Sequence, residues 1–148
     1  MSTRDYTYYN EIFKENTLPL AYLDVDMLNE NIDAIAQRAG KKSIRIASKS
    51  IRCRWVLQHI LERNSCYKGI MCFTGAEALF LSKQGFDDLL LGYPIVDKKQ
   101  IQQICASTKV GKKIILMVDL EAHLQLINDI AEKEDTVQPI CIDMDMSS

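Results

Sequence analysis

The fold follows from one stretch of the sequence, Lys68-Gly69-Ile70-Met71-Cys72-Phe73-Thr74-Gly75-Ala76-Glu77. Its first six residues form a short, mostly apolar run of the kind that predicts a buried strand. The last four place a glutamate three residues after a threonine, which predicts a capping box at the start of a helix. We expect this helix to include Ala78 to Gln84 and to end at Gly85. A strand that leads directly into a helix is the unit of an α/β fold.

The same order of strand and helix recurs on both sides of this stretch. Apolar runs predict five further strands, at residues 20–25, 43–48, 88–91, 113–118 and 139–145. Strands that alternate with helices imply a parallel sheet with right-handed crossovers. The spacing of the later strands is nearly even, which favours part of a (β/α)8 TIM-type barrel over a doubly wound sheet.

The helices carry recognisable start positions and apolar faces. Asp26, Asp97 and Asp119 stand where N-cap residues are expected. The helix after the 43–48 strand is expected to bury four side chains, namely Trp55, Val56, Ile60 and Leu61. The sheet face that turns toward the barrel interior is expected to carry Ile44, Ile46 or Ala47, Cys72, Met117 and Ile142.

Composition and charge exclude several classes of function. The net charge is −2 and the pI about 5.7, and basic residues form no block longer than a pair. The sequence therefore predicts no binding to nucleic acid and no membrane association. The N-terminus lacks the apolar core of a signal peptide, and no apolar run is long enough to span a membrane. We expect a cytoplasmic protein.

Motifs for other chemistries are missing. The six glycines form neither a P-loop nor a dinucleotide-binding pattern, and no serine stands in a G-x-S-x-G elbow. The five cysteines contain no C-x-x-C pair, and with only His59 and His123 to help them they suggest no zinc site. Cys72 and Cys141 lie in apolar strand patterns, where we expect structural burial.

Lys49 is the candidate catalytic residue. It follows the β-branched run Ser43–Ser48 and precedes a helical pattern, so it stands at the carboxyl end of a predicted strand. In α/β folds ligands bind at that end of the strands. Lysine also forms Schiff bases with carbonyl cofactors. Position alone leaves a second interpretation open, in which Lys49 is a solvated loop residue.

Five segments carry a resemblance to a known family, namely Pro19–Ile32, Arg45–Cys53, Gly69–Ala78, Met117–Asp119 and Ile142–Asp145. They resemble fold-type III enzymes that depend on pyridoxal 5′-phosphate (PLP), a group that includes alanine racemases, D-threonine aldolases and D-serine dehydratases. The pattern looks closest to proteins labelled amino acid deaminase/aldolase. It departs from the aldolases at Lys49, because Ser-Lys49-Ser-Ile-Arg stands where they usually have Arg-Pro-His-x-Lys. The type of reaction is therefore left open.

The resemblance implies an alanine racemase-like barrel in which Lys49 both binds PLP, as a Schiff base, and acts in catalysis. The implied function is that of a PLP-dependent lyase (aldolase or dehydratase), deaminase or racemase. The implied substrates are D-amino acids such as D-threonine or D-serine-like 3-hydroxyamino acids. A homodimer, and a divalent metal ion bound by residues outside this chain, are further expectations. Two alternatives remain, a noncatalytic PLP-binding homeostasis protein and an unrelated α/β binding domain.

Arg45 allows two interpretations. It lies on the same predicted strand as Lys49, where its charge would favour the neutral form of the lysine amine. It could equally form an ion pair with a carboxylate on an adjacent strand.

We expect residues 1–148 to form a single partial PLP-binding barrel domain. Residues 1–17 would be an N-terminal extension and residues 18–148 alternating β/α units, with a C-terminal β domain absent. A complete barrel needs about 250 residues. The expectation is therefore an N-terminal fragment that is inactive by itself.

Overall fold

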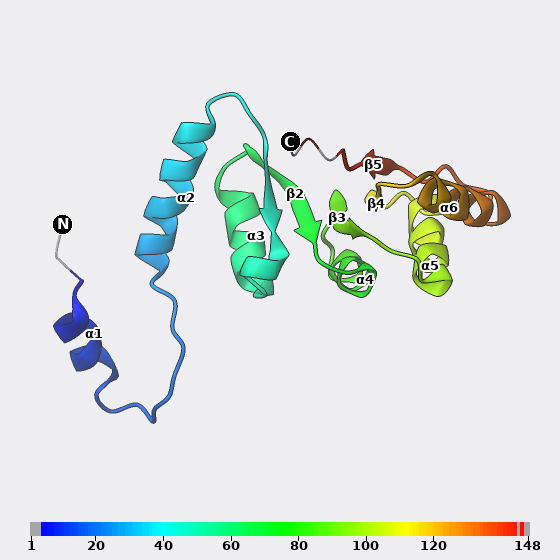
Figure 1. Cartoon of the computed structure of the whole chain (residues 1–148). Coiled ribbons are helices and arrows are strands. Elements are labelled where there is room, and N and C mark those ends of the chain that lie inside the picture. Colours follow the sequence, from blue (N-terminus) through cyan, green and yellow to red (C-terminus); the bar gives the residue numbers. More distant parts are fainter. Residues whose placement is uncertain (1–3, 145, 147–148) are drawn as a thin grey trace. The chain divides into compact units, whose positions relative to one another are not determined.

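A computed structural model describes residues 4–144 and 146 (Figure 1). The strands are β1 (Ile44–Ala47), β2 (Tyr67–Cys72), β3 (Leu89–Pro94), β4 (Ile114–Val118) and β5 (Ile140–Ile142). The helices are α1 (Tyr6–Phe13), α2 (Val25–Ala39), α3 (Arg54–Arg63), α4 (Gly75–Lys83), α5 (Lys98–Lys109) and α6 (Glu121–Lys133), with a 3-10 turn η1 (Ser48–Ser50). The chain divides into two compact units, Met1–Asn31 and Ile32–Ser148, which are described separately.

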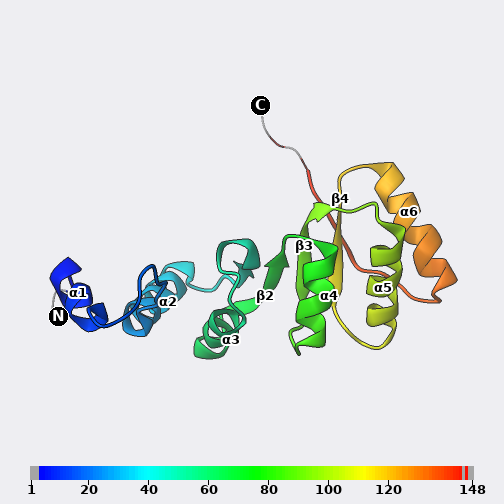
Figure 2. The same cartoon turned by 90° about the horizontal axis from the view of Figure 1, so that it is seen from below.

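The second unit contains one sheet in which all strands are parallel and follow one another in the order β1-β2-β3-β4-β5. A doubly wound sheet reverses its strand order near the middle, whereas a barrel does not. The predicted barrel-type architecture is therefore confirmed. Helix α4 packs on β2 and β3, and α5 and α6 pack on β4. Figures 1 and 2 show α4, α5 and α6 side by side along the sheet.

Burial alternates along the strands, as the pleat requires. The strand residues buried most deeply include Ile70, Cys72, Leu89, Leu91, Ile114 and Leu116. The residues between them, such as Met71, are more exposed, with Met71 at 37%. The first set faces the helices and forms the core, and the second faces the side that a closed barrel would enclose.

The expected inward face was wrong for Cys72 and Ile142, and of the alternatives Ile46 and Ala47 only Ala47 lies on that face. The register pairs Ile46 with Ile70 and Cys72 with Leu91, so Ile46 and Cys72 belong to the buried set, while Ile142 pairs with Val118. Ala47 pairs with Met71, and Met117 pairs with Cys141, on the more exposed side. Runs of apolar residues hide the alternation of period two, because both faces carry apolar side chains.

The predicted strand at residues 20–25 does not form. Its last residue begins α2, and residues 20–24 pair with no strand in the part of the chain that the structure describes. The predicted cap Asp26 is wrong for a related reason. Asp24 caps α2 instead, because its carboxylate accepts from the Met27 amide at 3.1 Å and its carbonyl from the Leu28 amide at 2.9 Å.

Asp24 is also the centre of the first unit. The hydroxyl of Tyr9, at 2.6 Å, and the guanidinium of Arg4 both donate to its carboxylate. The Tyr9 hydroxyl, the Met27 amide and Arg4 together lower the pKa of Asp24 to about 2. A carboxylate with these partners connects Arg4 and α1 to the start of α2.

Two of the other helix predictions also need correction. Asp119 does not cap α6, because the N-cap of this helix is Leu120. The Asp119 carboxylate instead lies 2.7 Å from Nδ1 of His123, in a contact that is not aligned as a hydrogen bond. On α3, Trp55 is 53% exposed and stacks on His59, and Leu57 is buried instead. The buried face of α3 is therefore rotated slightly from the predicted one.

The predicted cap at Thr74 is confirmed, but the reciprocal bond of the capping box differs, because Glu77 accepts from the amide before the cap and not from the Thr74 amide. The Thr74 hydroxyl accepts from the Glu77 amide at 3.1 Å, and the Glu77 carboxylate accepts from the Phe73 amide at 2.7 Å. Helix α4 begins at Gly75, and Gly85, with φ of +95°, follows its C-cap Gln84. Asp97 caps α5 as predicted, accepting from the amides of Lys99 and Gln100.

A clamp of charged residues holds the amino ends of the strands. We use this name for Arg45, Asp88 and Lys113. Arg45 donates to the carbonyl of Asp88 and, at 2.9 Å, to its carboxylate, which also lies 3.1 Å from Nζ of Lys113. Burial alone would raise the pKa of Asp88, but the hydrogen bonds from Arg45 and Lys113 outweigh it and lower the pKa.

The clamp decides between the two interpretations of Arg45. Its side chain reaches toward the amino ends of the strands, because Asp88 directly precedes β3. Of the two interpretations, the ion pair of Arg45 with a carboxylate is the one that the structure shows. Gly69 has a φ of +71° and lies next to the contact between Arg45 and Asp88. A Cβ atom at this position would collide with the Asp88 carbonyl and the Arg45 guanidinium.

We predict that Gly69→Ala lowers the free energy of unfolding by roughly 2 kcal/mol or more, from backbone strain and collision with the clamp. Gly40→Ala is the matched control, because Gly40 has φ of +58° and open space around it. It should cost only about 1 kcal/mol. Urea unfolding of both variants measures the difference. Equal losses would show that the clamp does not depend on Gly69.

We also predict that Thr74→Ala lowers the free energy of unfolding by about 1 kcal/mol, because α4 loses its side-chain cap. Thr74→Ser should keep most of the stability. Glu77→Gln should lower the melting temperature slightly and leave any enzymatic turnover in place. Loss of turnover at unchanged melting temperature would assign Glu77 a catalytic task instead.

Candidate functional site

Three residues from consecutive strands meet at the carboxyl edge of the sheet. Lys49 lies in the turn η1, two residues after β1 ends, and so is not the last strand residue as expected. Phe73 directly follows β2, and Tyr93 is near the end of β3. Since β1, β2 and β3 are neighbours and parallel, their carboxyl ends bring these side chains together.

The amine of Lys49 lies against two aromatic rings. Its Nζ is 4.9 Å from the centre of the Phe73 ring and 6.0 Å from the centre of the Tyr93 ring. The rings meet edge to face, with centres 5.5 Å apart and planes at 87°. Sequence reasoning missed both aromatic residues. Their position at the ends of the next two strands was the available clue.

Hydrogen bonds fix the backbone that carries Lys49. Ser48 is fully buried, and its hydroxyl donates to the Met71 carbonyl at 3.0 Å. The Ser48 carbonyl in turn accepts from the amides of Ile51 and Arg52, at 3.0 and 2.8 Å. Lys49 itself is exposed, so its amine is accessible on a rigid turn.

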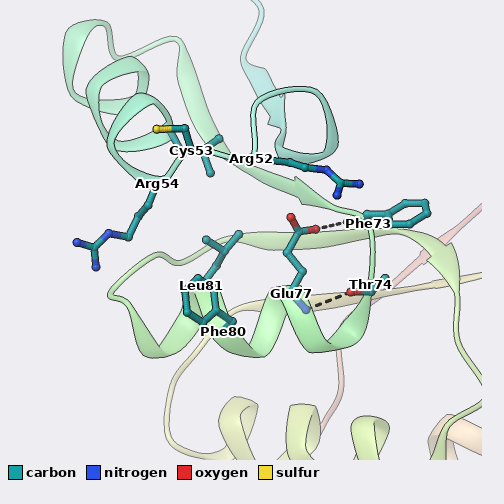
Figure 3. Close-up of a pocket in the computed structure, with 9 residues that line it drawn as sticks. Arg52, Cys53, Arg54, Phe73, Thr74, Glu77, Phe80 and Leu81 are labelled. Atoms are coloured by element: carbon teal, nitrogen blue, oxygen red, sulfur yellow. Dashed lines mark hydrogen bonds between the residues drawn. The ribbon is translucent and has the colours of Figure 1, made fainter. Parts of the chain in front are cut away.

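Two cavities open near this edge and share Phe73 and Thr74. The first has a volume of about 430 Å³ and is lined by Arg52, Cys53, Arg54, Leu57, Phe73, Thr74, Glu77, Phe80 and Leu81 (Figure 3). In Figure 3 the side chains of Arg52 and Arg54 extend in opposite directions, and the Glu77 carboxylate turns to the Phe73 amide. These charges therefore do not converge on one ligand position.

The second cavity lies between the loops that follow β2 and β3. Its volume is about 610 Å³, and it is lined by Phe73, Thr74, Gly75, Tyr93, Pro94, Ile95, Val96, Asp97 and Gln100. Phe73 and Tyr93 thus form part of its wall and also contact Lys49. Lys49 lines neither cavity. The candidate site therefore consists of the Lys49 amine and its two aromatic neighbours.

The cysteines and the strand-end aspartates are the other candidate reactive groups. Burial raises the pKa of the Cys72 thiol to about 12, so this cysteine is no nucleophile, and burial also raises the pKa of Cys105. Cys141 is only partly buried. Asp143 is exposed and continues the sheet through its amide, and the predicted strand-end residue Asp145 lies outside the described residues.

Residues 4–144 and 146 contain no group of three His, Cys, Asp or Glu side chains that could hold a metal ion. They also contain no helix with both the length and the apolar character that a membrane span requires.

Several solved structures are similar to this chain. A D-threonine aldolase from Filomicrobium marinum is 15% identical, with a TM-score of 0.80 over 88% of this chain and 35% of that one. A D-threo-3-hydroxyaspartate dehydratase from Delftia sp. HT23 is 22% identical, with a TM-score of 0.74 over 85% and 34%. An alanine racemase-like protein from Idiomarina loihiensis is 24% identical, with a TM-score of 0.66 over 80% and 31%.

These likenesses establish the fold, which is the N-terminal part of an alanine racemase-like barrel, and the chain spans about a third of the length of each relative. No curated protein matches the chain. The family model described as the N-terminal domain of alanine racemase matches residues 23–148. The resemblance seen in the sequence is confirmed, and the chain belongs to the alanine racemase N-terminal domain family.

Proposed function

We propose that this protein is a PLP-dependent enzyme acting on D-amino acids, and that Lys49 is the residue that binds the cofactor covalently. The observation that carries the proposal is the accessible Lys49 amine at the carboxyl edge of an alanine racemase-like sheet. Ligands of barrel enzymes bind at this edge. Family membership removes the interpretation of the chain as an unrelated α/β domain.

The residues at this edge fit PLP. An aldehyde needs a primary amine that solvent and ligand can reach, and Lys49 supplies one on a turn fixed by Ser48. Aromatic side chains suit a flat heteroaromatic ring, and Phe73 and Tyr93 stand beside the amine. The adjacent cavity of about 610 Å³ is within the usual size of small-molecule sites.

The mechanism assigns a distinct task to each of these residues. PLP, when bound, withdraws electrons from the substrate and so makes the bonds at Cα labile. The Lys49 nitrogen must lose a proton before it can attack an aldehyde carbon. Ser48 holds the turn against β2, and the rings of Phe73 and Tyr93 lie beside the amine.

For the reaction, we propose aldol cleavage or deamination of a D-3-hydroxyamino acid, such as D-threonine or a D-serine-like substrate. Support comes from the names of the structural relatives, a D-threonine aldolase and a D-threo-3-hydroxyaspartate dehydratase. Racemisation is the third reaction to test, because the matching family model is that of alanine racemase. A noncatalytic PLP-binding homeostasis protein would bind PLP through the same lysine without turnover of any of these substrates.

Several accompanying proposals rest on the same family membership. We propose a homodimer in the cytoplasm, with any divalent metal ion held by residues outside this chain. We retain residues 18–148 as one partial PLP-binding domain preceded by an extension, and these domain limits stay a prediction.

We predict that Lys49 is the site of covalent PLP attachment. The protein is incubated with PLP, reduced with borohydride and digested, and the labelled peptide is identified by mass spectrometry. The pyridoxyl group should be on Lys49, because this amine is accessible at the ligand-binding edge of the sheet. In Lys49→Ala the visible absorbance of bound PLP should disappear.

The control variant is Lys83→Ala, which removes an exposed lysine from the last turn of α4. It should keep both the label and the absorbance. Circular dichroism should be unchanged in both variants, since neither alters the buried strand residues. A label on another lysine with Lys49 unmodified would refute the assignment.

We also predict that the chain of residues 1–148 has little or no turnover by itself. It covers about a third of each solved relative, so most of the residues around a complete site would have to come from elsewhere. The assay follows glycine and acetaldehyde from D-threonine, and pyruvate and ammonia from D-serine, against free PLP as background. Turnover that is lost in Lys49→Ala would show that these residues suffice.

A further inference from the structure

The partners of the Lys49 amine are aromatic rather than acidic. We call Phe73 and Tyr93 together the aromatic corner. Among residues 4–144 and 146, no carboxylate oxygen lies within 4.0 Å of Lys49 Nζ, the limit for an ion pair. The rings at 4.9 and 6.0 Å are within the distance at which a ring face attracts a cation.

Separate contacts hold each ring of the corner in place. The Phe73 amide donates to the Glu77 carboxylate at 2.7 Å, which fixes the backbone just after β2. Gly92, next to Tyr93, lies so close to β2 that an added Cβ would be 3.3 Å from Met71 Cγ. The two rings then brace each other edge to face. The corner is therefore built by the end of β3 and the residue that follows β2.

We propose that Phe73 and Tyr93 are positioning residues that hold the Lys49 amine at the carboxyl edge in its charged form. This rests on the proposed function only in naming Lys49 as the cofactor-binding amine. The face of a ring carries partial negative charge, so it attracts the ammonium group but not the neutral amine. The rings therefore hold the amine at the carboxyl edge through its ammonium form, and an amine held in this way is less available to an incoming reagent.

Phe73 contributes more than Tyr93, because its ring centre is closer to Lys49 Nζ. The distances are 4.9 Å for Phe73 and 6.0 Å for Tyr93. The attraction comes from the ring face, so a phenol and a phenyl ring should serve almost equally. A leucine of similar bulk keeps apolar contact but lacks the charge distribution of a ring. This difference separates positioning of a cation from simple filling of space.

The experiment measures how fast trace acetic anhydride acetylates Lys49 in the protein without PLP, at one fixed, mildly alkaline pH. Mass spectrometry compares Lys49 with Lys83 in the same sample, so that Lys83 is the internal standard. In Phe73→Leu the ratio should rise roughly two- to five-fold, as expected from losing one exposed cation–π contact. Tyr93→Leu should give a smaller rise, and Phe73→Tyr and Tyr93→Phe should match the wild type.

Phe80→Leu is the matched control, because Phe80 is an exposed aromatic residue of α4 that lines the cavity away from Lys49. It should leave the ratio unchanged. If Phe73→Leu unfolds, buried and exposed lysines alike will react faster, and Tyr93→Leu then decides. An unchanged ratio in Tyr93→Leu and Phe73→Leu, or an equal rise in Phe73→Tyr, would overturn the proposal.

The two proposals fail separately. Borohydride labelling of a lysine other than Lys49 would remove the proposed function while leaving the acetylation ratios intact. Labelling of Lys49 together with unchanged acetylation ratios in both leucine variants would leave the function and remove the positioning role of the aromatic corner.

Discussion

Parallel pairing of consecutive strands is the constraint on which the rest of the structure depends. Because β1 to β5 run in one direction and in chain order, every strand presents its carboxyl end at the same edge. Residues separated by more than forty positions in the sequence, such as Lys49 and Tyr93, meet there. A reversal at any one strand would send its end residue to the opposite edge and break up the site.

The two edges of the sheet have different tasks. At the amino ends, Arg45, Asp88 and Lys113 form a clamp across β2 that leaves room only for a glycine at position 69. At the carboxyl ends, Lys49 is exposed on a turn held by the buried Ser48. Barrel folds generally concentrate stability at the first edge and chemistry at the second, which is why Lys49 is the candidate residue.

Family membership and local geometry give different information about the candidate site. Membership of the alanine racemase N-terminal domain family makes an accessible lysine at this edge a candidate for the PLP-binding residue. The aromatic corner supplies the local environment of that amine, through ring faces instead of a carboxylate. The same amine would serve an aldolase, a dehydratase or a racemase, so the choice of reaction depends on groups beyond these.

The sequence by itself determined the alternation of strands and helices from β1 onward, the caps at Thr74 and Asp97, and Lys49 as the candidate residue. These features depend on neighbours in the chain, such as Thr74 and Glu77 at the spacing of a helical turn. Only the tertiary structure decided that Arg45 pairs with Asp88, that Cys72 faces the helices, and that Phe73 and Tyr93 lie beside Lys49. Those contacts depend on strand register and pairing, in which a shift of one residue exchanges the two faces of a strand.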